Sequence, residues 1–345
     1  MKRLAWFLGP QGFGAYWADL ATHEFVRVDE KPDVTILPGF VDIHIHGGFG
    51  LDFMSGTSET LRALTAKLKD CGYEAFLPTT VTASFEDTRR ALATLTKDPA
   101  MPGFHLEGPF ISPRFPGAQP REQIAEIPTG PSEWDEVFDD PRLRVVTIAP
   151  EIPGALPLIS RLASRGVICS MGHTNATFAE ARAGFEAGVR HATHTFNAMR
   201  PFHHREAGAA GFAIAEQRLA AELIYDRIHV SASAAAILAQ CKPQDKLIAV
   251  SDGTMASGMP EGARLNMWGL DVIVGNGDAR LRDGTLAGSA ITLLDSFRNL
   301  HADLGPEIAI RATRLNPRSA LGLGKPNVYI VLDERLQIVE RLETS

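Results

Sequence analysis

The chain has 345 residues, of which 22% are charged and 45% are hydrophobic, a composition typical of a folded globular protein and not of a disordered one. Its 34 basic and 41 acidic residues give a net charge of −7, which argues against a nucleic-acid-binding surface. No apolar run reaches the roughly 18 residues of a membrane span, and the three scattered cysteines indicate reduced thiols, so we expect a cytoplasmic protein with no membrane contact.

Short β-branched runs that end in polar residues recur along the chain, and helix-like stretches such as 58–70, 176–187 and 231–241 lie between them. Strands that alternate with helices pair in parallel through right-handed crossovers, so eight such units predict an α/β fold with a closed (β/α)8 TIM-like barrel. An open doubly wound sheet is the alternative, because periodicity does not show whether a sheet closes. The eight predicted strands are 36–46, 75–81, 103–107, 145–149, 167–173, 191–196, 223–229 and 247–252.

The two ends of the chain differ from its middle and show short alternating strands. We predict that residues 1–37 together with 322–345 form a small β-sandwich domain, and that residues 38–321 form the barrel. The predicted strands of the small domain include 25–28, 328–332 and 337–339.

Side chains that bind metals stand at the carboxyl ends of the predicted strands. His44 and His46 are two residues apart, so on a strand both rings face the same side. Each such residue alone is more typical of a turn, a helix cap or a polar strand face. Their joint occurrence at one end of the barrel, where barrel enzymes build their active sites, favours a shared site. The other members are Glu107, His173, His194 and Asp252.

This set of residue types points to hydrolysis. One carboxylate and two imidazoles leave a divalent ion with an open position for water, as in catalytic sites. Such an ion lowers the pKa of water to roughly 7. Asp252 is a candidate to accept the proton and return it to a leaving group. The pattern therefore predicts attack of water on a polarised carbonyl.

Several motifs occur in order between residues 37 and 323. LPGFVDIHIHG, which begins at Leu37, resembles the first-strand signature of the amidohydrolase superfamily. HLEGP and ATHxFNAM together narrow the resemblance to the N-acetylglucosamine-6-phosphate deacetylase family. The motifs that carry it are HLEGPFISP at 105–113, TIAPE at 147–151, GHTNAT at 172–177, ATHTFNAM at 192–199, HHRE at 203–206, SDG at 251–253 and DGTLAGS at 283–289.

The resemblance implies a metal centre and a general acid/base. Glu107, His173 and His194 would bind the principal divalent ion, and Asp252 matches the family's general acid/base. His44 and His46 match the pair that binds a second ion in some members, so we expect one or two ions per subunit. The ligand types suit zinc, iron, manganese or cobalt, and Zn²⁺ or Fe²⁺ is the ion we expect.

The resemblance also implies a binding site for a sugar phosphate. Asn197 and Ala198 match the loop that meets the phosphate, and His229 matches a histidine that contacts the substrate. Arg205 matches the phosphate-binding arginine, since a guanidinium donates two parallel hydrogen bonds to a phosphate; its alternative is an ordinary solvated loop charge. Gln119 stands where the family places a histidine that contacts the substrate's amide oxygen, and its amide can donate a hydrogen bond there but cannot carry a proton.

Two further positions depart from the family's pattern. Arg227 stands where glycine is usual, and Thr195 stands where leucine is usual. These changes leave the metal-binding residues and Asp252 in place, so they bear on recognition of the substrate.

The function that the resemblance implies is the metal-dependent hydrolysis of the acetamide of N-acetyl-D-glucosamine 6-phosphate, which gives D-glucosamine 6-phosphate and acetate. Members of the family form homodimers in which the neighbouring subunit contacts the substrate, so we expect a homodimer here. One alternative is an amidohydrolase that acts on another N-acyl sugar or on a cyclic amide. Another is a catalytically impaired protein that only binds a sugar phosphate.

Overall fold

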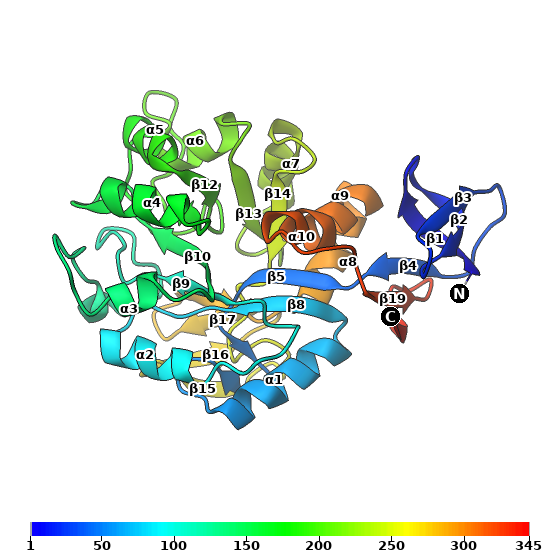
Figure 1. The fold of residues 1–345 in the computed structure, drawn as a ribbon, viewed down its shortest axis with the longest axis horizontal. Coiled ribbons are helices and arrows are strands. Elements are labelled where there is room, and N and C mark those ends of the chain that lie inside the picture. The colour runs from blue at the N-terminus through cyan, green and yellow to red at the C-terminus, as the bar shows by residue number, and fades with distance from the viewer. Residues whose placement is uncertain (1, 345) are drawn as a thin grey trace.

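The structure is a computed structural model that describes residues 2–344, and it has an α/β fold (Figure 1). Its largest parallel sheet has the strand order β14-β13-β12-β11-β10-β9. Every neighbouring pair in this sheet runs parallel, as expected for strands linked by helical crossovers. The strands are β9 (Phe104–Glu107), β10 (Leu143–Ile148), β11 (Ile168–Met171), β12 (Val189–Ala192), β13 (Ala220–Ile224) and β14 (Leu247–Val250).

A second parallel pair consists of β5 (Phe40–Ile45) and β8 (Tyr73–Pro78). Isolated parallel bridges link this pair to the larger sheet, one between Thr79 and His105 and the other between Ile45 and Gly253. Each of the eight strands overlaps one of the predicted barrel strands, and the prediction of an α/β fold is confirmed.

Some of the predicted strands extend too far toward their carboxyl ends. The expected strands 191–196 and 223–229 stop at Ala192 and Ile224. Beyond these points His194, Phe196 and Arg227 have positive φ values of 30°, 82° and 67°, which do not continue a β ladder. The chain therefore leaves the sheet just where its polar residues begin.

Helices pack around the parallel strands (Figure 1). The expected helices correspond to α1 (Ser58–Asp70), α5 (Phe178–Ala187) and α7 (Ala232–Cys241). In α5, the Thr177 side chain accepts from the Glu180 backbone while the Glu180 carboxylate accepts from the Thr177 backbone, a capping box. The other helices are α2 (Phe85–Ala93), α3 (Asp135–Phe138), α4 (Ala155–Ser164), α6 (Gly208–Ala215), α8 (Leu293–Leu304), α9 (Pro306–Ile310) and α10 (Asn316–Ala320). In the described part of the chain, no helix has the length and apolar character needed to cross a bilayer.

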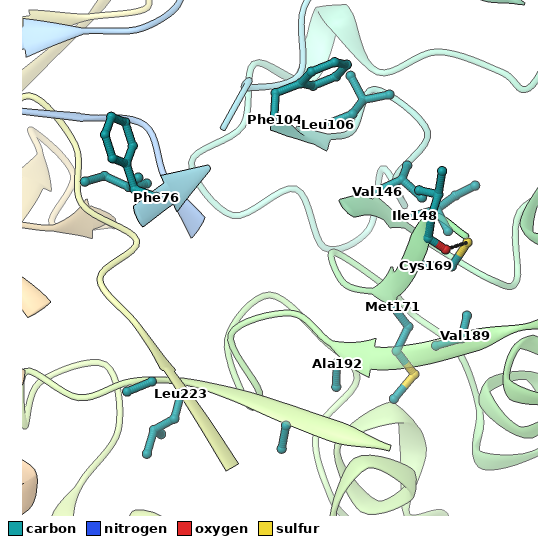
Figure 2. Close-up of a cluster of buried hydrophobic side chains, with 14 of the residues drawn as sticks. Phe76, Phe104, Leu106, Val146, Ile148, Cys169, Met171, Val189, Ala192 and Leu223 are labelled. Atoms are coloured by element: carbon teal, nitrogen blue, oxygen red, sulfur yellow. Dashed lines mark hydrogen bonds between the residues drawn. The ribbon is translucent and has the colours of Figure 1, made fainter. Parts of the chain in front are cut away.

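Alternation along the strands separates the largest apolar cluster from a second face, which carries polar side chains and a smaller apolar cluster. Because successive side chains of a strand point to opposite faces, the residues between the apolar ones share the other face. There, Thr147 Oγ1 lies 2.8 Å from both His105 Nε2 and Thr193 Oγ1, and Ser170 Oγ lies 2.6 Å from Thr193 Oγ1. The apolar cluster, drawn in Figure 2, includes Phe104, Leu106, Val146, Ile148, Cys169 and Met171.

Strands from both chain ends share one sheet, with the order β20-β19-β4-β1-β2-β3. The N-terminal strand β1 pairs in parallel with β4, which pairs on its other side with the C-terminal strand β19. The β-sandwich architecture and the domain boundaries remain predictions. The strands are β1 (Lys2–Gly9), β2 (Gly12–Asp19), β3 (Glu24–Arg27), β4 (Thr35–Pro38), β19 (Val328–Leu332) and β20 (Ile338–Glu343).

Arg314 lies where this sheet meets the parallel strands. Its guanidinium carbon stands 3.8 Å from the ring centroid of Phe40 on β5 and 4.2 Å from that of Phe297 on α8. Its Nε donates to the carbonyl of Pro38, the last residue of β4. The side chain is fully buried, and through these contacts it connects β4, β5 and α8.

A four-stranded antiparallel sheet, which the sequence analysis did not predict, follows β14. The turn between its first two strands consists of Trp268 and Gly269, whose φ values of 53° and 82° are typical of a two-residue hairpin turn. Its strands are β15 (Arg264–Met267), β16 (Leu270–Val274), β17 (Asp278–Leu281) and β18 (Leu286–Ser289), and two short strands, β6 (Gly47–Gly48) and β7 (Leu51–Asp52), form a separate hairpin.

Candidate metal centre

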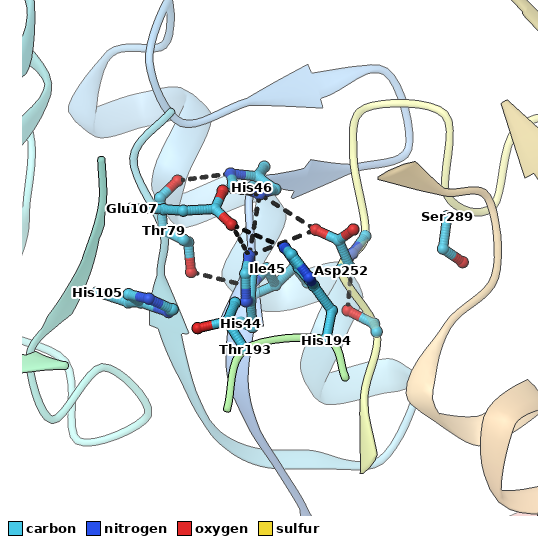
Figure 3. A network of polar contacts seen from close by, with 12 residues as sticks. His44, Ile45, His46, Thr79, His105, Glu107, Thr193, His194, Asp252 and Ser289 are labelled. Carbon is cyan, nitrogen blue, oxygen red and sulfur yellow. Dashed lines mark hydrogen bonds and ion pairs between the residues drawn. The ribbon is translucent and has the colours of Figure 1, made fainter. Parts of the chain in front are cut away.

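Six side chains that can bind metals converge where the parallel strands end, as the sequence predicts. Figure 3 shows five of them, all but His173. One lies within β5, one directly after it, and one is the last residue of β9. The others follow β11, β12 and β14 at the second residue beyond each strand. In chain order they are His44, His46, Glu107, His173, His194 and Asp252.

Glu107, His173 and His194, which we call the first cluster, lie in mutual contact. Glu107 Oε1 is 3.2 Å from His173 Nε2 and 3.2 Å from His194 Nε2, and the two Nε2 atoms are also 3.2 Å apart. All three residues are buried. These are the residues expected to bind the principal ion.

His44, His46 and Asp252, which we call the second cluster, lie beside the first. The two Nε2 atoms are 3.2 Å apart, and Asp252 Oδ1 is 3.4 Å from that of His44 and 3.2 Å from that of His46. Glu107 joins the two clusters, because its Oε1 lies 3.3 Å from His44 Nε2 and its Oε2 lies 3.3 Å from His46 Nε2. One carboxylate thus faces both groups of ligands.

Three of the histidines turn Nε2 toward the clusters and Nδ1 toward a backbone carbonyl oxygen. His46 Nδ1 lies 3.1 Å from the carbonyl oxygen of Thr79, and His173 Nδ1 lies 3.1 Å from that of Phe115. His194 Nδ1 similarly lies 3.2 Å from the carbonyl oxygen of Asn197. A carbonyl oxygen accepts a hydrogen bond, so each Nδ1 donates there and Nε2 is the ring nitrogen left to bind a metal ion.

This arrangement fits a divalent cation. The ligands of a tetrahedral zinc ion, at about 2.0 Å from the metal, lie about 3.3 Å from one another. The distances of 3.2 Å within the first cluster match that spacing. Two Nε2 lone pairs that face each other beside a carboxylate repel unless a positive charge stands between them, and the clusters therefore suit metal ions.

The electrostatics of the second cluster call for positive charge. Burial lowers the pKa of His46, but hydrogen bonds and charge from Asp252 and Glu107 outweigh it and raise the pKa to about 9. Burial likewise raises the pKa of Asp252, but His46 and His44 outweigh it and lower the pKa. The two carboxylates thus hold a positive charge among them, which a cation supplies in place of protons.

The backbone at the site is unusual. His173, His194 and Asp252 have positive φ values of 47°, 30° and 45°, a region that side chains other than glycine rarely occupy. Gly108, which follows Glu107, has a φ of 70°, and a Cβ there would stand 2.2 Å from the Thr82 hydroxyl oxygen. The HLEGP motif therefore needs its glycine for both backbone conformation and space.

A cavity of about 210 Å³ opens beside both clusters. Asn197, Ala198 and His229, all expected to contact the substrate, line it. His229 Nδ1 lies 2.5 Å from Asp226 Oδ2. Burial lowers the pKa of His229, but the hydrogen bond and charge of Asp226 outweigh it, so the pKa is raised and the ring favours its charged form, which suits a phosphate.

Gln119 also lines the cavity, but its amide is already bonded. Its Oε1 accepts from the Thr82 backbone at 2.7 Å, and its Nε2 donates to Glu107 Oε2 at 2.6 Å. Gln119 therefore orients the carboxylate that joins the two clusters. Its predicted contact with the substrate's amide oxygen remains a prediction.

Two arginines that the sequence analysis singled out lie outside the residues that line this cavity. Arg205 is exposed, with its Nη1 3.0 Å from His204 Nε2. Arg227 pairs with both carboxylate oxygens of Asp303 on α8, at 2.7 and 2.8 Å. The unusual cation at position 227 is thus neutralised away from the site.

Some residues of the site were not predicted from the sequence. Trp268, at the tip of the β15–β16 hairpin, lines the cavity, and its ring centroid lies 5.6 Å from that of His46. Its Nε1 donates to Asp52 Oδ2 at 3.0 Å. The alternating residues around Trp268-Gly269 are a hairpin signal that indicates the turn but not where it points. Thr254 and Leu286 also line the cavity.

A family model for amidohydrolases matches residues 35–327. The chain belongs to the amidohydrolase family. Over 290 residues, which are 79% of this chain and 72% of the relative, this amidohydrolase is 38% identical to the N-acetylglucosamine-6-phosphate deacetylase of Bacillus subtilis (strain 168). It is 33% identical over 331 residues to an N-acetylgalactosamine-6-phosphate deacetylase of Escherichia coli O157:H7, with 91% of this chain and 87% of that one covered.

A solved structure agrees with these relatives. The amidohydrolase resembles a mutant N-acetyl-D-glucosamine-6-phosphate deacetylase from Mycobacterium smegmatis, solved in complex with N-acetyl-D-glucosamine-6-phosphate. The TM-score is 0.90 at 31% identity, and the match covers 99% of this chain and 97% of that one.

Proposed function

We propose that this amidohydrolase removes the acetyl group of N-acetyl-D-glucosamine 6-phosphate, giving D-glucosamine 6-phosphate and acetate. The observation that carries the proposal is the pair of clusters joined by Glu107 at one wall of a cavity that His229 and Asn197 also line. Relatives with this activity cover most of the chain.

Glu107, His173 and His194 would hold one ion, and His44, His46 and Asp252 would hold a second. When bound, a divalent cation supplies the Lewis acidity that activates water against an acyl carbon. Zinc or iron is the ion we propose, since imidazole and carboxylate ligands suit both.

The residues around the clusters would handle the proton and the sugar phosphate. Asp252 Oδ1 contacts both histidines of the second cluster and its side chain lines the cavity, so it is placed to take a proton from water and pass it to the leaving amine. His229, the backbone at Ala198 and the Asn197 amide would hold the phosphate end. The exposed Arg205 would reach the phosphate from the neighbouring subunit of a homodimer.

The test is acetate release from the phosphorylated sugar, measured with and without a chelator on protein of known metal content. We expect one or two divalent ions per subunit, loss of acetate release with the chelator, and recovery when Zn²⁺ or Fe²⁺ is added back. Full release by metal-free protein would contradict the proposal. Equal kcat/KM for the unphosphorylated sugar would favour another N-acyl substrate.

A second candidate substrate is N-acetyl-D-galactosamine 6-phosphate, the C4 epimer. The Escherichia coli relative that bears this activity in its name is 33% identical over 91% of this chain. The same assay with both sugars decides between them: the substrate with the higher kcat/KM at equal metal loading is the one for which the cavity is built.

We further propose that the eight parallel strands form one closed (β/α)8 barrel over residues 38–321. The bridges between Thr79 and His105 and between Ile45 and Gly253 support closure, because they continue the parallel order at both edges of the larger sheet. The sheet made from both chain ends supports the small β domain of residues 1–37 and 322–345.

A further inference from the structure

Glu222 is a buried carboxylate with no role in the chemistry described so far. It lies in β13, in the otherwise apolar segment Ala-Ala-Glu-Leu-Ile, and its side chain is completely buried. An ionised carboxylate in such surroundings is strongly unfavourable unless partners compensate it. Its position in the barrel wall therefore depends on what it contacts.

The contacts of Glu222 are two histidine rings. Its Oε1 lies 3.2 Å from His191 Nδ1 on β12, and its Oε2 lies 3.7 Å from His44 Nδ1 on β5. Neither Glu222 Oε2 nor His44 Nδ1 has another hydrogen-bond partner among the described residues. The two atoms face each other at slightly more than hydrogen-bond distance.

His44 differs in this respect from the other histidines of the two clusters. His46, His173 and His194 each place Nδ1 against a backbone carbonyl oxygen. The neighbouring ring of His105 does not replace such an acceptor, because its nitrogens lie against the Ile43 carbonyl and the Thr147 hydroxyl. His44 alone relies on a side chain.

We propose that Glu222 is a positioning residue that accepts the Nδ1 hydrogen of His44 and thereby sets the affinity of the second cluster for its cation. With Nδ1 protonated, His44 Nε2 keeps the lone pair that it turns toward Asp252 and Glu107. The other carboxylate oxygen of Glu222 lies 3.2 Å from His191 Nδ1 and takes no part in the contact with His44. The inference rests on the proposed function, since it assumes that the clusters bind metal.

Because only His44 depends on a side-chain acceptor, mutation can affect the second cluster without affecting the first. Substitutions cannot remove a backbone carbonyl, but they can remove the Glu222 carboxylate. Loss of such an outer partner typically weakens metal affinity 10–100-fold. A substitution at Glu222 should therefore lower the affinity of the second cluster for its ion and leave the affinity of the first cluster unchanged.

The experiment measures metal content and affinity, not activity. Wild-type protein and the variants Glu222→Leu and Glu222→Gln are stripped of metal, loaded with Zn²⁺ and titrated with a chromophoric chelator, and bound zinc is counted by elemental analysis. We expect two ions in the wild type. In Glu222→Leu the weaker ion should lose about 10–100-fold in affinity, and in Glu222→Gln, whose amide oxygen still accepts from His44, it should lose less.

His191→Leu is the matched control, because it disturbs the same buried network but leaves the Glu222 carboxylate beside His44. We expect it to keep two ions with affinities close to those of the wild type. An equal loss in His191→Leu, or unchanged affinities in both Glu222 variants, would overturn the role of Glu222 and leave the proposed function standing. A wild type that holds a single ion overturns the inference alone, and one that holds none overturns both. If Glu222→Leu does not fold, the affinity of Glu222→Gln for the second ion is compared with those of the wild type and His191→Leu instead.

Discussion

At the scale of single residues, the carboxylate of Asp252 faces both the second cluster and the cavity. Its Oδ1 contacts both histidines of the second cluster, and the side chain also lines the cavity where a substrate would lie. A general base must take up a proton, and a carboxylate can do so, whereas an amide of the same shape can accept a hydrogen bond but cannot carry the proton.

Asp252→Asn should therefore retain the ion of the first cluster and the substrate while kcat falls about 10²–10⁴-fold, the usual contribution of a general acid/base. Metal content by elemental analysis and substrate binding by calorimetry are measured beside turnover. Asp271→Asn, at an exposed carboxylate of β16 that pairs with Arg282, is the control and should behave as the wild type. Near-normal turnover in Asp252→Asn would remove this residue from the mechanism.

The residues that the sequence identified are those with a recognisable context. Glu107, His173 and His194 each lie at or just after the end of a strand within a motif, so their place at a strand end could be predicted. Glu222 could not, because it lies within an apolar segment and its partners come from β5 and β12, far away in the chain. Arg205 has a motif, but its place on an exposed loop depends on packing that the motif does not encode.

At the scale of elements, the strand order was readable and the hairpin sheet was not. A β-branched run followed by a helical stretch recurs eight times, and repetition made the parallel strands predictable. The β15–β18 sheet occurs only once in the described residues, so no repeated sequence pattern could be used to predict it. It brings Trp268 to the wall of the cavity, edge-to-face with His46.

The place of Trp268 beside His46 predicts that the indole limits the size of the acyl group. Trp268→Ala should lower the preference for N-acetyl over N-butanoyl substrate at least about tenfold in kcat/KM, since each methylene in a tight pocket is worth about 10–200-fold. Trp268→Phe keeps an aromatic edge but loses the hydrogen bond to Asp52, and should stay closer to the wild type. An unchanged acyl preference in Trp268→Ala would place the acyl group elsewhere.

At the scale of the whole molecule, Arg314 joins the sheet from the two chain ends to the parallel strands. The guanidinium lies between Phe40 and Phe297 and donates to the Pro38 carbonyl, so one side chain contacts three elements. Cation–π contacts out of water are worth about 2 kcal/mol. A cavity at a buried site costs further stability.

Arg314→Ala should therefore lower the free energy of unfolding by about 3 kcal/mol, measured by urea denaturation. Arg314→Met refills part of the volume without the charge and should recover part of that loss. Metal content should be unchanged in both variants, because Arg314 lies outside both clusters. Wild-type stability in Arg314→Ala would mean that the cost of burying the guanidinium cancels its contacts.

The left-handed backbone at His173, His194 and Asp252 lowers the stability of the fold at residues that the chemistry requires. Each such conformation costs about 1–3 kcal/mol in residues other than glycine, and the rest of the protein must compensate for it. Glycine at these three positions would remove the backbone strain but also the side chains that the reaction needs. Inactive descendants of this enzyme that carry glycine there are therefore expected to be more stable than the enzyme itself. Evolution toward heat tolerance would then have to act elsewhere in the molecule, because the easiest gains lie at the positions it must not change.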